Sequence, residues 1–195
     1  NLTKDNIYVL ESPILSNSQF EKFTVFFKNS HKVLDCTFDV QSSLKKRLDQ
    51  LCSEAEIAVR KGCKHLILTD KTISEKKVAI PMILAFGAIN SKLINLGIRG
   101  FVSINIQTGE VLDTHSFAVL LGVGATTINP YLALDSIYQR YEKKLFGKFS
   151  YKECVQRYIK SVDNGLLKIM SKMGISVLSA YRGGCNFETV GLSRA

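Results

Sequence analysis

The sequence predicts an α/β fold in which parallel βαβ units form an open sheet or an incomplete barrel flanked by helices. Short runs rich in β-branched residues begin near positions 33, 65, 101 and 125, and a segment with helical spacing of apolar residues follows each run. This alternation is typical of parallel strands joined by right-handed crossover helices. The chain has 195 residues, enough for one buried core. We therefore expect a single α/β domain over residues 1–195, with a minor boundary near Gly147.

The expected strands are short and are bounded by glycine, proline or polar residues. They cover 33–38, 65–69, 101–106, 125–128 and 175–181. Polar surface loops are expected at 71–77 and 146–150.

The helices of the first two units have recognisable ends. One apolar face runs through residues 44–59, and Gly62 follows as a stop signal. The next helix lies between Pro81, which favours a first turn, and Gly97, which favours an end. Both helices are expected to pack their apolar faces on the sheet.

Two shorter helices are expected after the third strand. Asp113 or Thr114 caps a helix that reaches Leu121. Another begins near Pro130, because proline is tolerated in a first helical turn.

The longest helix has a capping box at its start. Ser150 and Glu153 each satisfy a free backbone N–H there. Gly174 is the expected stop, and a turn at Gly183-Gly184 leads into a last short helical piece.

The chain is basic, with 26 Lys and Arg against 17 Asp and Glu residues and a formal net charge of +9. Such an excess suits nucleic acid or a membrane surface. The basic residues, however, lie in short groups on separate elements, without the interleaved aromatic residues that stack on bases. No apolar run approaches the ~20 residues of a membrane-spanning helix, and the first ten residues hold no signal-peptide core. We therefore expect a cytoplasmic protein, with an organelle as the alternative location in a eukaryote. A membrane is not expected as a partner, and nucleic acid is disfavoured.

Metal and catalytic signals are weak. The five cysteines include no Cys-x-x-Cys pair, which suits reduced thiols. Cys63 and His65 supply two zinc donors, but no second pair completes a set of four. The three histidines and five cysteines allow many catalytic dyads, and their spacing selects none. No catalytic, cofactor-binding or metal-ligating residue is therefore assigned.

Two glycine pairs keep an alternative function open. Gly122-Val-Gly124 and Gly183-Gly184 resemble the tight turns that present backbone N–H groups to phosphate, but neither continues into a G-x-G-x-x-G fingerprint. A helix end with close backbone approach is the favoured interpretation. The alternative is a free-standing phosphate- or flavin-binding α/β protein.

Four collinear motifs resemble the central domain of the glutamate synthase large chain. The most specific one comprises GLLKIMSKMGIS at 165–176 followed by YRGGCNFETVGL at 181–192. LESPIL at 10–15 resembles the entry segment of that family, and ILTDK at 67–71 resembles a strand ending in a Ser-Asp-Arg-like triplet. LLGVGA at 120–125 with INPYLA at 128–133 resembles its glycine-rich turn and following helix. The resemblance covers nearly the whole chain.

The resemblance implies a parent enzyme with three cooperating domains. In glutamate synthases an N-terminal amidotransferase domain releases ammonia from glutamine, and an FMN domain with an iron–sulfur cluster reduces the imino acid formed from 2-oxoglutarate. The central domain links the two and is not known to supply catalytic groups. This chain is accordingly expected to be a non-catalytic docking module without a cofactor of its own, its partners being the amidotransferase and FMN domains of the same parent chain. The electron donor and the oligomeric state are left open.

The residues of the chain are consistent with a domain that lacks the catalytic groups of the parent enzyme. The chain begins with Asn1 rather than Met or the N-terminal cysteine nucleophile of the amidotransferase domain, so a segment of a longer protein is expected. The dispersed cysteines offer no closely spaced trio for an iron–sulfur cluster.

The chain also departs from the family pattern at several positions. Asn90, Ser91 and Lys92 stand where a run of histidines is common, Ser116 replaces one histidine of a pair, and Val123 replaces a tyrosine. Any role of those imidazoles is in doubt here. Two questions stay open. The chain belongs either to a divergent branch of the family or to a relaxed remnant of it, and it is either an excised piece or a natural protein.

Six polar residues are the candidates for contact with an adjoining domain or a ligand. Most of them lie at the end of the long helix or along the following segment, where a core role is harder to assign. They are Ser171, Lys172, Ser176, Tyr181, Arg182 and Asn129.

Overall fold

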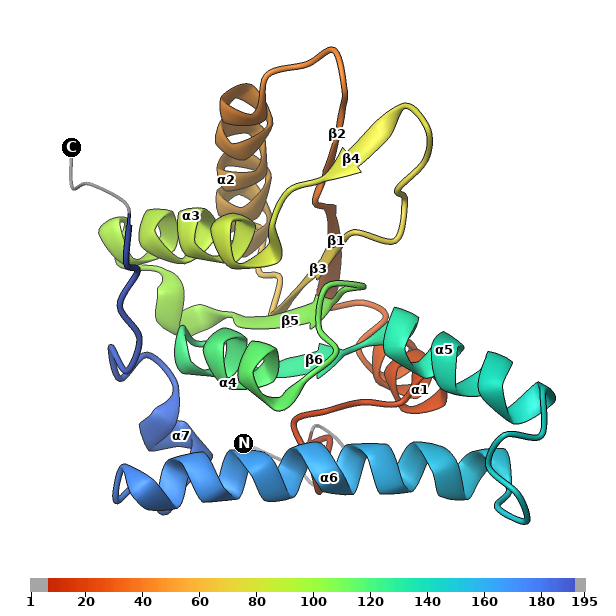
Figure 1. Ribbon diagram of the computed structural model, residues 1–195. Helices are drawn as coiled ribbons and strands as arrows, with labels where there is room; N and C mark the ends of the chain where they lie inside the picture. The colour runs from red at the N-terminus through yellow and green to blue at the C-terminus, as the bar shows by residue number, and fades with distance from the viewer. Residues whose placement is uncertain (1–6, 192–195) are drawn as a thin grey trace.

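A computed structural model describes residues 7–191 of the chain (Figure 1). Strands and helices alternate along most of it. The strands are β1 (His31–Asp35), β2 (Thr37–Asp39), β3 (His65–Thr69), β4 (Lys77–Ala79), β5 (Ser103–Gln107) and β6 (Thr127–Asn129). The helices are α1 (Asn17–Phe26), α2 (Leu44–Arg60), α3 (Met82–Asn95), the 3-10 turn η2 (Arg99–Phe101), α4 (Thr114–Gly122), α5 (Tyr131–Glu142), α6 (Tyr151–Lys172) and α7 (Leu178–Tyr181).

Four strands form a parallel sheet in the order β1-β3-β5-β6. The sheet is open, with no closed barrel, so the predicted α/β class is confirmed in its open form. Beside β6, the segment before α1 adds a parallel bridge from Ile14 to Ile128. There the Leu15 N–H donates to the Ile128 carbonyl and the Ile128 N–H donates to the Pro13 carbonyl, both at 2.8 Å.

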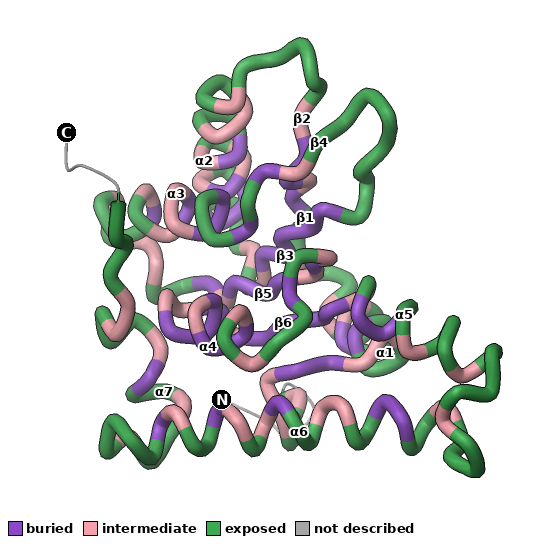
Figure 2. The backbone as a smooth tube through the Cα atoms, viewed as in Figure 1, coloured by how far each residue is buried: buried purple, intermediate pink, exposed green. Residues whose placement is uncertain are grey.

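Helices cover both faces of the sheet, because alternate side chains of a strand point to opposite faces. Leu66 and Leu68 of β3 join the main core, to which α2, α3, α4 and α6 contribute. Ile67 points the other way and packs with Phe20 and Phe23 of α1. Figure 1 shows α2 and α3 above β5 and the long α6 below β6, next to α4. Burial is concentrated in the four strands of the parallel sheet, whereas the loops beside the β2–β4 pair and the α5–α6 connection are exposed (Figure 2).

The expected strand over 33–38 is divided in the structure. β1 ends at Asp35, and β2 pairs with β4 in a separate two-stranded antiparallel sheet. The cause is local: the Asp35 carboxylate accepts hydrogen bonds from the backbone N–H of Thr37 at 3.0 Å and from its hydroxyl at 2.8 Å. This Asx-type turn takes the chain out of the sheet. The expected loop at 71–77 is correct except that Lys77 already belongs to β4.

The expected strand over 175–181 is wrong. Gly174 adopts a φ of +69° and ends α6, while the Ile175 N–H donates to the Met170 carbonyl in a helix-ending turn. Residues 178–181 then form α7. A strand there would lack a partner at β6, because the Ile14 bridge already occupies that edge.

The last expected helical piece, after Gly183-Gly184, is also wrong for the described residues. Residues 185–191 form no helix. The other expected helices are confirmed, and so is the strand at 65–69. The strands expected at 101–106 and 125–128 lie instead at 103–107 and 127–129. The α1 helix and the two-stranded β2–β4 sheet were not predicted.

Candidate functional site

The carboxyl ends of β3, β5 and β6 form the edge at which parallel α/β sheets place their ligands. Thr69, Gln107 and Asn129 are aligned there in register. The Thr69 hydroxyl donates to the Gln107 side-chain oxygen at 3.0 Å, and the Gln107 amide donates to Asn129 Oδ1 at 3.1 Å. The Asn129 amide donates to the Leu15 carbonyl at 2.9 Å and to Asn17 Oδ1 at 3.0 Å. Asn129, a predicted contact residue, is thus fully buried and ties the start of α1 to the sheet.

Asp70 follows β3 at the same edge and is fully buried. Its carboxylate accepts hydrogen bonds from the Thr108 hydroxyl and from the Gly109 N–H, the latter at 3.1 Å to each oxygen. A Cβ on Gly109 would lie 3.0 Å from the Tyr131 hydroxyl, so the loop passes close to α5. Burial and then the charge of Asp70 raise the pKa of Tyr131 to about 12.

Glu110 occupies the start of α3. Its carboxylate accepts a hydrogen bond from the Met82 N–H at 2.9 Å, one of the free N–H groups of the first turn. Burial raises the pKa of Glu110, and the charge of Asp70 acts in the same direction. Asp70 and Glu110 therefore fix loops and a helix end, and in the described part of the chain no group of three His, Cys, Asp or Glu side chains is placed to hold a metal ion.

Arg182, another predicted contact residue, lies near the amino end of β6, at the end of the sheet opposite the carboxyl edge. Its Nη2 donates to the Thr126 carbonyl at 2.7 Å, just before β6 begins. Its Nε is buried with no hydrogen-bond partner among residues 7–191, and burial lowers the pKa of the guanidinium. Arg182 and Ser176 line a groove of about 500 Å³. Asp163 lies in the same groove, where it accepts a hydrogen bond from the Ser12 hydroxyl at 2.8 Å.

Tyr181 is a core residue. It is fully buried, and its hydroxyl donates to the Ala118 carbonyl of α4 at 3.0 Å. The Phe187 ring packs edge-on beside it at a centroid distance of 6.5 Å. A Cβ on Gly122 would lie 2.5 Å from that Phe187 ring.

The six predicted contact residues thus fall into separate groups. Ser171, Lys172 and Ser176 are exposed at and beyond the end of α6. Arg182 is half-buried nearby, Tyr181 is internal, and Asn129 lies at the far edge of the sheet. The structure brings Ser176 and Arg182 together and separates both from Asn129.

The glycine turns considered for phosphate binding are occupied by protein groups. Gly124, with a φ of +119°, lies beside the Phe86 ring and the Arg99 guanidinium. Phe187 covers Gly122 as described, and the Gly183 N–H donates to the Gly122 carbonyl at 2.8 Å. These glycines permit close packing, as the favoured interpretation holds.

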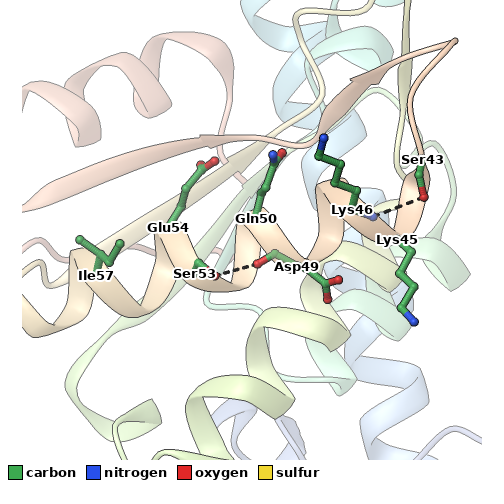
Figure 3. A pocket seen from close by; sticks show the side chains of 8 residues that line it. All are labelled: Ser43, Lys45, Lys46, Asp49, Gln50, Ser53, Glu54 and Ile57. Atoms are coloured by element: carbon green, nitrogen blue, oxygen red, sulfur yellow. Dashed lines mark hydrogen bonds between the residues drawn. The ribbon is translucent and has the colours of Figure 1, made fainter.

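A further depression lies along α2 (Figure 3). All the residues that line it come from this helix and its cap, and their side chains extend outward along one face. Ser53 Oγ donates to the Asp49 carbonyl at 3.0 Å, and Ser43 caps the helix by accepting from the Lys46 N–H. Lys45 and Lys46 lie near the start of the helix and Asp49 and Glu54 farther along it, and such a mixture of charges is typical of a solvated helix face.

Two of the departures from the family pattern have local partners. Asn90 Oδ1 accepts from Arg99 Nε at 2.7 Å, and Arg99 also donates to the Val102 and Gly124 carbonyls. The Ser116 hydroxyl donates to Asp113, the cap of α4, at 2.6 Å.

Sequence reasoning missed Asp70, Thr108 and Gln107, which organise the carboxyl edge. The signal for Asp70 was present, since an acidic residue directly after a buried strand in 67–71 belongs at that edge. Gln107 and Thr108 carry no comparable signal, because polar residues after a strand are common in surface loops.

Within residues 7–191, no helix has the length and apolar character needed to cross a membrane.

Comparison with known proteins gives one consistent result. The family model described as the glutamate synthase central domain matches residues 2–193. The NADPH glutamate synthase large chain of Azospirillum brasilense is 47% identical over 99% of this chain, and that of Bacillus subtilis is 40% identical over 95%. The chloroplastic ferredoxin-dependent glutamate synthase of Oryza sativa subsp. japonica is 40% identical over 95% of this chain. The chain spans only 13%, 12% and 12% of the lengths of these relatives.

Proposed function

We propose a docking role for this chain, which belongs to the glutamate synthase central domain family. In this proposal it is one α/β domain over residues 1–195. It holds the catalytic domains of a glutamate synthase large chain together and takes no part in the chemistry. The observation that carries this proposal is the match of the family model over residues 2–193. The parent enzyme converts glutamine and 2-oxoglutarate into two molecules of glutamate. Its amidotransferase domain supplies ammonia, and its FMN domain, with the iron–sulfur cluster, performs the reduction.

The geometry of the carboxyl edge supports a structural role. The side chains that a ligand would meet there, Thr69, Gln107 and Asn129, bond to one another and to the segment before α1. Asp70 is likewise engaged by Thr108 and Gly109. An edge whose polar groups are matched internally fixes loop positions, which is what a docking module needs.

The contact surface that we propose lies around the end of α6. Ser171, Lys172 and Ser176 are exposed there. The apolar side chains of Leu167, Met173 and Val177 are 61%, 44% and 53% exposed in the same region. Exposed apolar groups mixed with polar ones are typical of interfaces between domains. We call these six residues the α6-end surface.

The test is a substitution in the full-length large chain that contains this sequence. Val177→Asp places a charge in the α6-end surface, and Ile57→Asp on α2 is the matched control, since these two side chains are 53% and 54% exposed. We expect Val177→Asp to leave glutamine hydrolysis intact and to lower the 2-oxoglutarate consumed per glutamine hydrolysed, because ammonia transfer requires correctly docked domains. Ile57→Asp should keep the ratio of the unsubstituted enzyme.

Two results would contradict the proposal. Equal ratios in the two variants would remove the α6-end surface as a contact. Loss of the separate glutaminase and flavin-reduction activities in a fully folded Val177→Asp enzyme would argue for a direct part in catalysis.

A further inference from the structure

A second apolar groove lies between α5 and α6, apart from the α6-end surface. Its volume is about 550 Å³. Aromatic and aliphatic side chains of both helices, of their connection and of the loop before α4 line it, among them Leu112, Ile137, Phe146, Phe149 and Tyr158. The Tyr158 hydroxyl donates to the Leu112 carbonyl at 3.2 Å, which holds that loop against α6. We call this site the α5–α6 groove.

Two arginines stand at the rim of the groove. Arg140 belongs to α5 and Arg157 to α6, and both are exposed. The Arg157 guanidinium lies over the Phe149 ring at 4.1 Å from its centroid. Glu153 is the nearest acidic residue on α6. Its carboxylate accepts hydrogen bonds from the N–H and the hydroxyl of Ser150 at 2.8 and 2.7 Å. In the described residues, neither arginine forms an ion pair with a carboxylate.

The excess positive charge of the chain is concentrated at this end. Residues 140–160 contain seven Lys and Arg residues against two Glu residues, a net of +5 out of the +9 of the whole chain. This segment includes the whole connection between the two helices, which projects from the body of the molecule (Figure 1). Arg140 and Arg157 line the groove itself, whereas Lys152 and Lys160 line a different pocket beside α1. A positive charge beside apolar side chains favours a ligand of the opposite sign that also carries apolar side chains.

Large apolar side chains are also exposed here. Of the residues that line the groove, Leu112 is 57% exposed and Phe149 is 42% exposed. Solvated helix faces seldom gather aromatic side chains around an apolar groove, whereas interfaces are enriched in aromatic residues and arginine. The groove is therefore better explained by an occupant than by solvent.

We propose that the α5–α6 groove binds an acidic segment with apolar side chains that belongs to the same large chain outside residues 1–195. This inference rests on the proposed function and names a partner for a second surface. The chain spans 12–13% of its relatives, so most of such a polypeptide is available to supply the segment. Nucleic acid fits less well, because Arg157 already covers a face of the Phe149 ring on which a base would stack. A membrane surface fits less well because the apolar side chains line a concavity.

The experiment uses a photo-crosslinker in the full-length large chain. p-Benzoylphenylalanine replaces Phe149, an exposed aromatic residue at the groove, and crosslinked peptides are identified by mass spectrometry. We expect a crosslink within one polypeptide to a segment in which Asp or Glu residues flank apolar ones. The double charge reversal Arg140→Glu with Arg157→Glu should reduce its yield at least tenfold. Lys45→Glu with Lys46→Glu makes the same change of charge on α2 and should leave the yield unchanged.

Several outcomes would overturn the inference. These are a crosslink that survives the reversal at the arginines, one to a basic segment, one between two copies of the chain, or one to lipid or nucleic acid. The same probe at Val177, in the α6-end surface, separates this inference from the proposed function. A crosslink to another domain from Val177 but none from Phe149 removes the α5–α6 groove alone, whereas none from either position removes both.

Discussion

The hydroxyl of Tyr181 donates a hydrogen bond at 3.0 Å to the carbonyl of Ala118, 63 positions earlier in the sequence. Both residues are fully buried, so this bond fastens α7 to α4 inside the core. Tyr181→Phe keeps the ring and leaves the carbonyl without this donor. We expect the free energy of unfolding to fall by about 0.5–1.5 kcal/mol, the net contribution of one buried hydrogen bond. Urea unfolding of the 195-residue chain measures it, with exposed Tyr138→Phe as a control that should change little.

Gly165 lies where α6 crosses the start of α4. A Cβ at this position would come within 2.5 Å of Thr114 Cγ2 and 2.7 Å of its Oγ1. Gly165→Ala should therefore destabilise the chain by about 1–3 kcal/mol, as overpacking does. Gly87→Ala on α3 is the matched control: its Cβ meets nothing within 4 Å, so it should stabilise by about 0.5–1 kcal/mol. Thermal unfolding of both variants checks the contrast, and equal shifts would refute a close contact between α4 and α6.

Thr108 donates its hydroxyl to the Asp70 carboxylate, and both residues are fully buried. Thr108→Val preserves shape and removes the donor. The free energy of unfolding should fall by about 1.5–3 kcal/mol, because the lost hydrogen bond has a charged group as its acceptor. Thr24→Val on α1 is the control, because its hydroxyl donates to the Glu21 carbonyl near the surface. This substitution should change the free energy of unfolding by no more than about 0.5 kcal/mol. Denaturant titrations of the two variants measure both changes in the free energy of unfolding. They test whether the hydrogen bonds of the carboxyl edge hold its loops in place, as proposed.

His65 gives the chain a dependence on pH. Burial, and then the charge of neighbouring His31, lower the pKa of His65 below the ordinary value of 6.5. The unfolded state therefore binds a proton more readily than the folded state, so stability is full above pH 6.5 and falls as pH drops through the lowered folded pKa. His65 Nδ1 is also buried with no partner among residues 7–191, and its ring lies 3.8 Å from that of Phe27.

His65→Phe keeps an aromatic ring against Phe27 and removes the titrating group. We expect the unsubstituted chain to lose more stability than the variant between pH 7 and pH 5. The measurement is the difference in denaturation midpoint between the two proteins across that range, which cancels the contribution of carboxyl groups. A constant difference would show that His65 does not cause the dependence.

Periodicity predicted the parallel α/β class and most helices, because apolar spacing and cap residues act locally. The 44–59 pattern and the Ser150 capping box both identify real helices. Long-range pairing was not predictable in this way. Residues 175–181 have the composition of a strand, but the β6 edge is filled by Ile14, far away in sequence. The sequence predicts Tyr181 as a polar contact residue, because nothing in it shows that the hydroxyl will meet the Ala118 carbonyl of α4 inside the core.

The candidate site was less predictable than the fold. Strand-end residues such as Asp70 are visible as isolated polar positions, but their hydrogen bonds depend on the register of three strands. The clustering of Arg140 and Arg157 around one groove depends on how α5 and α6 pack. In the sequence, these two residues are ordinary members of solvated helices.

The bridge between Ile14 and Ile128 bears on how this protein resists aggregation. Pro13 and Leu15 supply the backbone groups that would otherwise be free along β6. An unprotected strand edge recruits strands from other molecules. A truncation that removes residues 1–15 would therefore expose a template for intermolecular β-pairing, and the shortened protein should form oligomers although every strand of its sheet is intact.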